Sequence, residues 1–182
     1  MSGWKTKSRK TVYENDWLRM WEDQVEKPNG ELGIYGYVEQ KAVGGTFIVP
    51  VDERGNIYLI KLARYTTNYL GWEVPAGSTE YGETILEAAQ RELEEELGMR
   101  AQTVKLINPK PIFGAPGLTN AVFNIVLAKE LSKIKTNKQY EEGILKTRAF
   151  SQTQVLDMIR NGEILDGPTI LAVYLVLDFL KQ

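Results

Sequence analysis

The 182-residue chain contains no cysteine and no histidine. Disulfide bonds, zinc sites built from these residues, cysteine nucleophiles and Ser-His triads are therefore all excluded. Proton transfer must use carboxylates, lysine, tyrosine or metal-bound water instead. A metal site must bind mainly through oxygen atoms, and such a site favours Mg²⁺ or Mn²⁺.

The chain also lacks a charge excess and a long apolar run. Its 22 basic and 24 acidic residues leave a net charge of −2, which gives no footprint for a nucleic-acid polymer or an anionic membrane. The N-terminus, MSGWKTKSRK, is basic, but no apolar stretch follows it, so it does not read as a signal peptide. The longest apolar run, residues 170–180, is too short to cross a bilayer. We expect a cytoplasmic protein whose partners are small molecules.

Residues 11–40 alternate roughly in polarity, and the turn signal Pro28-Asn29-Gly30 divides them. This pattern predicts a small antiparallel sheet. Ordinary strand packing would explain its many aromatic residues; alternatively, some of them stack on a nucleobase or are buried in a dimer interface. These aromatic residues are Tyr13, Trp17, Trp21, Tyr35 and Tyr37.

The rest of the chain mixes short strands with helices. Two β-rich runs flanking a turn predict a hairpin, at residues 46–51 and 56–62. Further strands are predicted at 103–107, 121–128 and 145–150, and helices at 85–97, 153–161 and 169–180. This mixed order predicts an α/β (α+β) sandwich in residues 44–182, preceded by the small sheet in residues 1–43.

The segment 77–99, GSTEYGETILEAAQRELEEELGM, carries the best-specified helix. Thr84 and Glu87 form a capping box, and Gly98 stands where a left-handed residue ends a helix. Two further glycines, Gly77 and Gly82, let the preceding loop fold tightly. An apolar stripe at spacings of three and four residues should be buried on the sheet; it comprises Leu86, Ala89, Leu93 and Leu97.

Glu92, Glu95 and Glu96 follow the same spacing, so their carboxylates should converge beside this stripe. If that face is enclosed, the repulsion between them must be offset, and Mg²⁺ would do so with the oxygen ligands that it prefers. A solvated acidic face is the commoner result for such runs. The spacing alone leaves both interpretations open.

The same segment resembles the box of the Nudix family: Gly, five residues, Glu, seven residues, Arg-Glu, an aliphatic residue, any residue, Glu-Glu, any residue, Gly and an aliphatic residue. This chain supplies it without a gap, with Gly77, Glu83, Arg91, Glu92, Leu93, Glu95, Glu96, Gly98 and Met99. The resemblance implies a Nudix α/β/α sandwich with a mixed sheet. It also implies that Glu92, Glu95 and Glu96 bind Mg²⁺, with Mn²⁺ as a possible substitute. Arg91 would pair with Glu83, although Glu87 is equally reachable.

The flanking residues resemble one group within that family, the ADP-ribose pyrophosphatases and related nucleotide-sugar hydrolases. Arg64-Tyr65 followed by Trp72–Gly77 (WEVPAG) is similar to their "R-Y … E-L-P-A-G" run. By this resemblance the Ala76 carbonyl joins the metal shell, Arg64 contacts phosphate, and Tyr65 and Glu73 lie at the substrate. A surface strand position is the alternative for Arg64.

Ala115-Pro116-Gly117 resembles the "S-P-G" loop of the same group and places Pro116 and Gly117 at the substrate. Ala115 stands where serine is usual, and Ala121 where an acidic residue is common, so nucleoside diphosphate sugars other than ADP-ribose remain open. Trp17 is a candidate for stacking on the base.

The group often carries a catalytic carboxylate on a loop before the last strand. The loop residues 139–143 fit this description. We prefer Glu142 to Glu141 as the general base because it lies two residues before the expected strand start, although exposed loop glutamates are usually only solvated. Glu95 of the box is the other candidate.

Together these features predict Mg²⁺-dependent hydrolysis of the pyrophosphate bond of a nucleoside diphosphate sugar, such as ADP-ribose or GDP-mannose. The products would be a nucleoside monophosphate and a sugar phosphate. By resemblance, the N-terminal sheet makes a two-fold homodimer. The alternatives are another Nudix substrate (a dinucleoside polyphosphate, NADH or a nucleoside triphosphate) and a non-catalytic nucleotide-sensing module.

Overall fold

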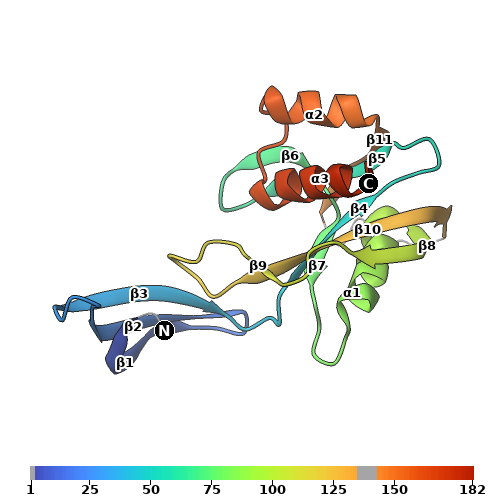
Figure 1. Cartoon of the computed structure of the whole chain (residues 1–182). Helices are drawn as coiled ribbons and strands as arrows, with labels where there is room; N and C mark the ends of the chain where they lie inside the picture. Colours follow the sequence, from blue (N-terminus) through green and yellow to red (C-terminus); the bar gives the residue numbers. More distant parts are fainter. Residues whose placement is uncertain (1–2, 135–142) are drawn as a thin grey trace.

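A computed structural model describes residues 3–134 and 143–182 of the chain. Its N-terminal part is an antiparallel sheet in the order β1 (Lys5–Glu14), β2 (Leu18–Glu26) and β3 (Leu32–Gln40), which extends away from the rest of the molecule (Figure 1). The predicted turn is confirmed, since the Gly30 amide donates to the Lys27 carbonyl at 2.9 Å and Gly30 is left-handed. The sheet begins six residues earlier than the alternating pattern indicated.

The central sheet is mixed, as predicted. Its strand order is β7 (Ala76–Ser78), β4 (Gly45–Pro50), β10 (Val122–Lys133) and β8 (Met99–Leu106), and β9 (Ile112–Phe113) also pairs with β10. β4 runs parallel to β10, while the other pairs in this sheet are antiparallel. The sheet therefore brings β7, which opens the Nudix-like segment, next to β4 at one edge.

A third sheet is antiparallel, in the order β11 (Ile144–Phe150), β5 (Ile57–Arg64) and β6 (Tyr69–Glu73). It shows that the predicted hairpin of residues 46–51 and 56–62 is wrong. The turn exists, with the Gly55 amide donating to the Asp52 carbonyl at 2.9 Å, but β4 and β5 enter different sheets and meet at a single isolated bridge. β4 pairs instead with β7 and β10, and β5 pairs with β6 and β11, all of which come later in the chain.

The three predicted helices are confirmed as α1 (Ile85–Glu92), α2 (Gln152–Arg160) and α3 (Gly167–Phe179). The capping box of α1 is present, because Thr84 Oγ1 accepts from the Glu87 amide and the Glu87 carboxylate accepts from the Thr84 amide. Beyond Glu92 the helix continues as a π-helix over Leu93–Leu97 and ends at left-handed Gly98. The change from α to π geometry was not predicted.

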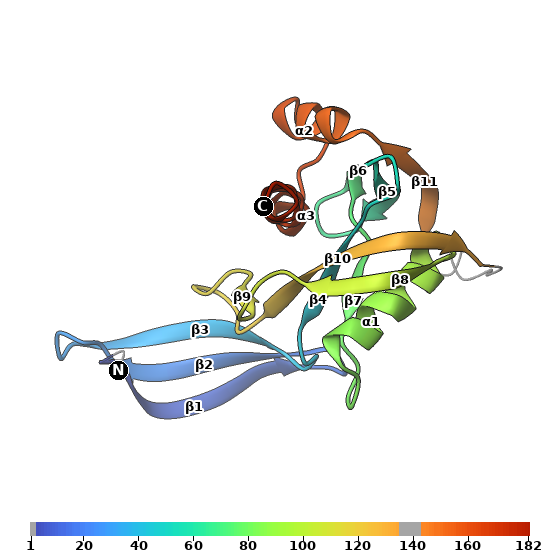
Figure 2. The same cartoon turned by 45° about the vertical axis from the view of Figure 1, so that its right-hand side comes forward.

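α1 covers one face of the central sheet and α3 covers the other (Figures 1 and 2). Alternate residues of β10 enter the two cores: Ile125 and Leu127 pack beneath α2 and α3, while Val126 and Ala128 pack beneath α1. The predicted α/β/α sandwich is therefore confirmed.

The apolar stripe of the box helix is confirmed at Ala89, Leu93 and Leu97, which are all buried. It is wrong at Leu86, whose side chain is largely exposed, and Ile85 packs against the core in its place. The buried row runs at intervals of four residues from Ile85, so Leu86 is turned toward solvent.

The N-terminal sheet is joined to the rest of the molecule by hydrogen bonds from β3 to the loop of residues 115–120. The Val38 amide donates to the Leu118 carbonyl at 2.8 Å, and the Gln40 amide donates to Asn120 Oδ1 at 2.9 Å. This loop is the one that resembles the "S-P-G" motif. The sheet and a predicted substrate loop are therefore held together within one chain.

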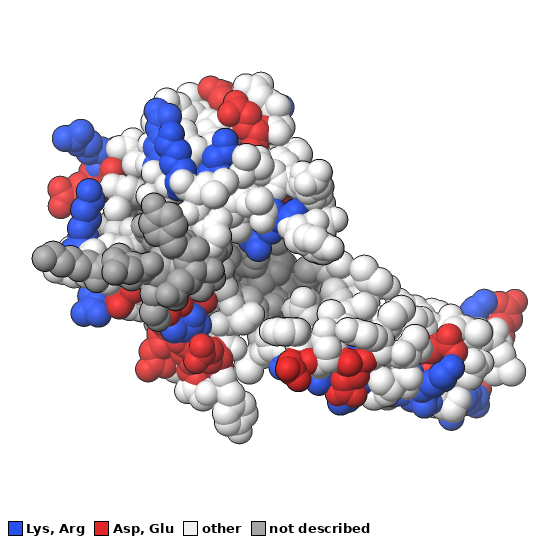
Figure 3. Space-filling view, turned by 180° about the vertical axis from the view of Figure 1, so that it is seen from behind, with Lys and Arg blue, Asp and Glu red and all other residues white. Residues whose placement is uncertain are grey.

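Acidic and basic side chains are interspersed over the face of the molecule seen in Figure 3, including the projecting N-terminal sheet. Among the helices of residues 3–134 and 143–182, none combines the length and apolar composition needed to cross a membrane.

Candidate active site

The box segment brings strand β7 against the helix that carries the glutamates. The Ala76 amide donates to Glu96 Oε2 at 2.8 Å. The next residue, Gly77, lies so close to the Glu92 carboxylate that a Cβ there would overlap it. Glu92 and Glu96 are both buried. The first glycine of the box is therefore required by the approach of Glu92, whereas Gly82 serves the loop through its left-handed backbone.

Arg91 is the cation at the centre of this cluster. Its guanidinium binds both oxygens of Glu83 at 3.0 Å, and its Nη2 also donates to the Ser78 carbonyl at 2.9 Å. These bonds hold the pKa of the Glu83 carboxyl below its usual value. The sequence left open whether Arg91 pairs with Glu83 or Glu87. The structure pairs Arg91 with Glu83, because the Glu87 carboxylate is bound within the capping box.

The remaining bonds of Arg91 reach two of the predicted metal ligands. Nη1 lies 2.6 Å from Glu92 Oε1 and 3.3 Å from Glu95 Oε2, while Glu96 is directed toward β7. Within the described residues, no three carboxylates stand close enough together to hold a metal ion as they are. Glu95 and Glu96 lie in the π-helix, a form of helix that is frequent at functional sites.

The chemistry of the cluster nevertheless fits a hard divalent cation. Its side-chain donors are carboxylate oxygens from Glu83, Glu92, Glu95 and Glu96. The Arg91 guanidinium places a positive charge against three of them, Glu83, Glu92 and Glu95. Like charges enclosed together require positive charge nearby. Mg²⁺ and Mn²⁺ would supply such charge and bind through oxygen.

Arg64 and Glu73, predicted at the substrate, form a bidentate ion pair across β5 and β6. Arg64 Nη2 lies 2.6 Å from Glu73 Oε2, and Nε lies 3.1 and 3.2 Å from the two carboxylate oxygens. The hydrogen bonds to Glu73 raise the pKa of Arg64, and the charges of Asp166 and Glu96 act in the same direction. Arg64 is thus within electrostatic range of Glu96 in the box cluster. Tyr65 is fully exposed beside it.

Trp17 borders a cleft of about 550 Å³ between the end of the N-terminal sheet and the loop that precedes α1. Its side chain is 75% exposed, and Tyr81 across the cleft is exposed as well. Ser78, whose carbonyl binds Arg91, also lines this cleft. An exposed aromatic ring therefore stands within the same cavity as a residue of the box.

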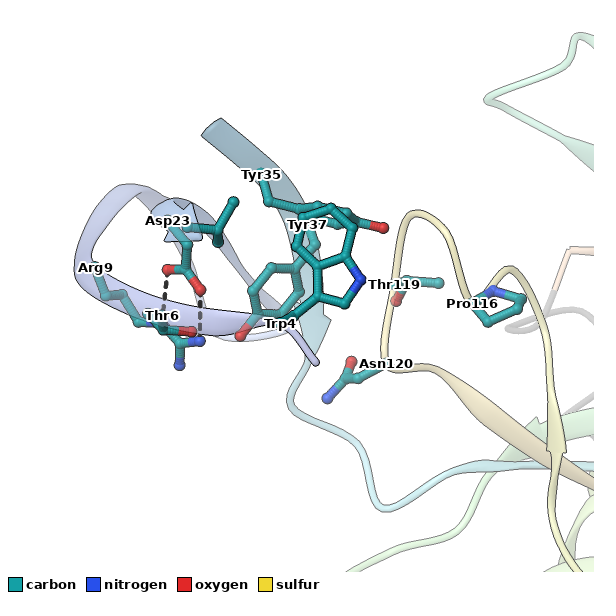
Figure 4. Close-up of a pocket in the computed structure, with 10 residues that line it drawn as sticks. Trp4, Thr6, Arg9, Asp23, Tyr35, Tyr37, Pro116, Thr119 and Asn120 are labelled. Carbon is teal, nitrogen blue, oxygen red and sulfur yellow. Dashed lines mark hydrogen bonds and ion pairs between the residues drawn. The ribbon is translucent and has the colours of Figure 1, made fainter. Parts of the chain in front are cut away.

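Pro116 lies in a different cavity, of about 390 Å³, between the N-terminal sheet and the 115–120 loop (Figure 4). Trp4 and Tyr35 meet edge to face there at 5.6 Å, and the Tyr35 hydroxyl donates to the Gly117 carbonyl at 3.1 Å. The predicted residues Pro116 and Gly117 are thus brought together with aromatic residues of the sheet.

A charged pair in that cavity was not predicted from the sequence. Arg9 binds buried Asp23 through two hydrogen bonds of 2.7 and 2.8 Å, and its guanidinium stacks over Trp21 at 4.8 Å and over Tyr37 at 5.5 Å. The sequence did contain a sign of this pair. Asp23 alternates with Trp21 and Val25 on the inward face of β2, and a charge in a buried position needs a partner.

Glu141 and Glu142, the two candidates for the loop base, lie outside the described residues. The described residues assigned to substrate, metal and catalysis occupy three neighbourhoods: the box cluster with Arg64, the cleft at Trp17 and the cavity at Pro116. Their roles stay predictions.

Comparison with known proteins agrees with this arrangement. Residues 41–169 match the NUDIX domain, and residues 4–38 match the nucleoside diphosphate sugar hydrolase N-terminal domain. The chain is 28% identical to an ADP-ribose pyrophosphatase of Bacillus subtilis (strain 168), over 98% of this chain and 95% of that relative. It is 27% identical to the ADP compounds hydrolase NudE of Escherichia coli (strain K12), over 86% of this chain and 82% of that relative.

A crystal structure of an ADP compounds hydrolase has the same fold, with a TM-score of 0.86 at 22% identity, covering 98% of this chain and 94% of that one. The NUDIX match spans the central sheet, the box helix and the cluster around Arg91. The chain belongs to the Nudix family, and it carries the N-terminal domain of nucleoside diphosphate sugar hydrolases.

Proposed function

We propose that this chain hydrolyses the pyrophosphate bond of nucleoside diphosphate sugars such as ADP-ribose or GDP-mannose, with Mg²⁺ as its cofactor. A nucleoside monophosphate and a sugar phosphate would be released. The observation that carries this proposal is the contact of the box glutamates with β7, in a chain that has both the Nudix domain and the sugar-hydrolase N-terminal domain. The relatives named for ADP-ribose and ADP compounds support the substrate class.

The metal would be held by the carboxylates of Glu92, Glu95 and Glu96 and by the Ala76 carbonyl, with Mn²⁺ as a possible substitute for Mg²⁺. A divalent ion bound there supplies positive charge for the diphosphate oxygens and increases the acidity of a water molecule. Arg91 holds Glu92 and Glu95 in place from one side, and the Ala76 amide holds Glu96 from the other.

Protein side chains would bind the substrate and move the proton. Arg64 offers a planar guanidinium to a phosphate, a group that binds well to such a fork. Glu95 is the candidate base among the described residues, and Glu142, followed by Glu141, is the candidate from the loop. A carboxylate suits the role because the chain has no histidine.

The base would stack on Trp17, since an exposed indole beside the box loop offers a large flat surface. Tyr65 is a second exposed ring near Arg64. The cavity at Pro116 and Gly117 would contribute contacts from the same substrate loop. Tests of each ring by substitution would separate these positions.

A homodimer through the N-terminal sheet is part of the proposal. The register places Leu32 and Ile34 of β3 on the same face as Met20 of β2, and all three side chains are exposed. Glu22, Gln24 and Glu26 of β2 lie on the same face, so its exposed apolar side chains stand among polar ones. A second copy of the sheet would cover these apolar side chains.

Hydrolysis in ¹⁸O-labelled water tests the function directly. The purified chain with Mg²⁺ should convert ADP-ribose, GDP-mannose or a UDP-sugar into a monophosphate and a sugar phosphate, and the labelled product identifies the phosphorus attacked. A nucleoside triphosphate preferred over every diphosphate sugar would contradict the substrate class. Binding of nucleotides without turnover would instead favour a sensing module.

We also propose that the chain divides into an N-terminal unit, residues 1–43, and a catalytic unit, residues 44–182, and that it acts in the cytoplasm.

A further inference from the structure

Glu73 has a position that its predicted role at the substrate does not explain. Its carboxylate lies at the end of β6 and is 1% exposed. Both of its oxygens accept hydrogen bonds from Arg64. Glu73 borders a cleft with Arg64, but its carboxylate repels phosphate and both of its oxygens are already bound to Arg64. Its effect on a bound phosphate is therefore exerted through Arg64.

Stability does not account for the pair either. A buried ion pair is often no more stabilising than apolar residues of similar size, because both charges lose their hydration. Its distinctive effect is geometric, since two parallel hydrogen bonds fix the plane and direction of a guanidinium. Arg64 uses Nε and Nη2 for Glu73, and these bonds leave Nη1 directed elsewhere. Nearly half of the Arg64 side-chain surface is exposed.

The exposed part of Arg64 lines a cleft of about 530 Å³, which Glu73 also borders. One wall is the loop of residues 66–69, and the other is the start of α3 at residues 165–167. The Tyr69 hydroxyl donates to the Glu163 carbonyl at 2.7 Å and ties the two walls together. Asn68 is left-handed, which closes the loop tightly. The cleft therefore has a hydrogen bond joining its two sides and one oriented guanidinium at its edge.

The cleft is also near the box cluster. Glu73 lies three residues before Ala76, whose amide donates to Glu96 Oε2 at 2.8 Å, and Asp166, the N-cap of α3, lines the cleft itself. A diphosphate held at the box glutamates would thus lie beside the Arg64 guanidinium. The carboxylates around it repel a phosphate, so the direction in which this cation points affects how tightly the group binds.

We propose that Glu73 is a positioning residue that fixes the Arg64 guanidinium so that its remaining N–H groups bind a phosphate of the substrate. The inference rests on the proposed function for the identity of the substrate. The geometry requires only an anionic phosphate. Glu73 acts through Arg64 and does not itself touch the ligand.

The test is a double-mutant cycle on the full chain with Glu73→Gln, Arg64→Lys and the combined variant. KM and kcat are measured for ADP-ribose with Mg²⁺, and ADP binding is measured by calorimetry. Each single variant should raise KM and weaken ADP binding about tenfold, the size expected for losing one charge-assisted contact. The value of kcat should change less than about threefold, and the combined variant should lose no more than either single one.

Asp157→Asn is the control, because it removes an exposed ion pair with Arg160 on α2. It should change neither KM nor ADP binding. A folded Glu73→Gln protein with wild-type KM and ADP affinity would overturn the proposal, even if its melting temperature fell. Losses that multiply in the combined variant would also overturn it, since they mean that the two residues act independently.

If Glu73→Gln does not fold, the ADP affinity of Arg64→Lys tests the proposal instead. Lysine keeps a positive charge for Glu73 but cannot form the planar fork, so wild-type ADP affinity in this variant would contradict the proposal. The calorimetric readout also separates this inference from the proposed function. Coupled losses in ADP binding without hydrolysis of any diphosphate sugar would refute the function and support the role of Glu73.

Discussion

Gly77 and Glu92 touch across the space between β7 and the box helix, so that any side chain at residue 77 would overlap the Glu92 carboxylate. The backbone of Gly77 does not have the positive φ that makes glycine necessary at Gly82. The requirement for glycine at the start of the box is therefore one of space. Glu92 in turn is held at 2.6 Å by Arg91, which leaves its carboxylate little freedom to move away.

Gly77→Ala should displace the Glu92 carboxylate and lower kcat at least tenfold, while the protein stays folded. The reason is that a ligand moved by about an ångström loses much of its effect on the reaction. Gly82→Ala is the control, since a Cβ at Gly82 meets no atom within 4 Å and introduces only backbone strain. It should lower stability by about 1 kcal/mol and leave kcat near wild type. Equal activity in the two variants would contradict the assignment.

Glu96→Gln should reduce turnover at least a hundredfold with little change in melting temperature. Glutamine keeps the oxygen that accepts from the Ala76 amide, so β7 stays in place, but it removes a negative charge that a divalent ion requires. Steady-state kinetics over a range of Mg²⁺ concentrations is the measurement. Activity restored fully by saturating Mg²⁺ would mean weakened ion binding alone, and wild-type activity at all concentrations would remove Glu96 from the metal site.

Local patterns were sufficient to predict the box helix and most strands. The capping box at Thr84 and the left-handed Gly98 mark the two ends of the helix through bonds within a few residues. Strand β7 was not predicted because three residues carry no periodic pattern. The separation of β4 and β5 was missed for a different reason: pairing with β10 and β11 depends on contacts far along the chain.

The residues of the candidate site divide in the same way: those that share a local pattern could be predicted, and those that meet across strands could not. Glu92, Glu95 and Glu96 could be named because they share one helix, and their resemblance to a known box adds residues upstream. Arg9 and Asp23 could not be named as a pair, because strand register alone places them opposite each other on β1 and β2. The π turn that separates Glu95 and Glu96 from an ideal α-helical spacing leaves no local signal in the sequence.

Acid should open the N-terminal sheet before it unfolds the rest of the molecule. Lys5 and Lys7 lower the pKa of Glu26 to about 2, and Arg19 and Lys41 lower that of Glu14 to about 2. Because these folded values lie below the unfolded value of about 4.3, the stability they contribute is complete above that pH. It is lost as the pH falls from about 4.5 toward about 2.

Tryptophan fluorescence can follow this transition in the variant Trp72→Phe, since the other three tryptophans all lie within the first 21 residues. Glu26→Gln should flatten the pH dependence, and added salt should weaken it because these pairs are exposed to solvent. A sheet whose fluorescence stays constant from pH 5 to pH 2 would show that the ion pairs do not contribute.

Exposed apolar residues on one face of the N-terminal sheet give the last prediction. Ile34 is 65% exposed, and Leu32 and Met20 are exposed on the same face. The wild-type chain should sediment as a dimer at micromolar concentration, and Ile34→Glu should sediment as a monomer with an unchanged circular dichroism spectrum. Charge placed in the centre of an apolar interface is strongly unfavourable. Leu145→Glu on β11, which changes a similarly exposed leucine, should stay dimeric. A wild-type monomer, or a dimer that survives Ile34→Glu, would mean that this face does not join two copies.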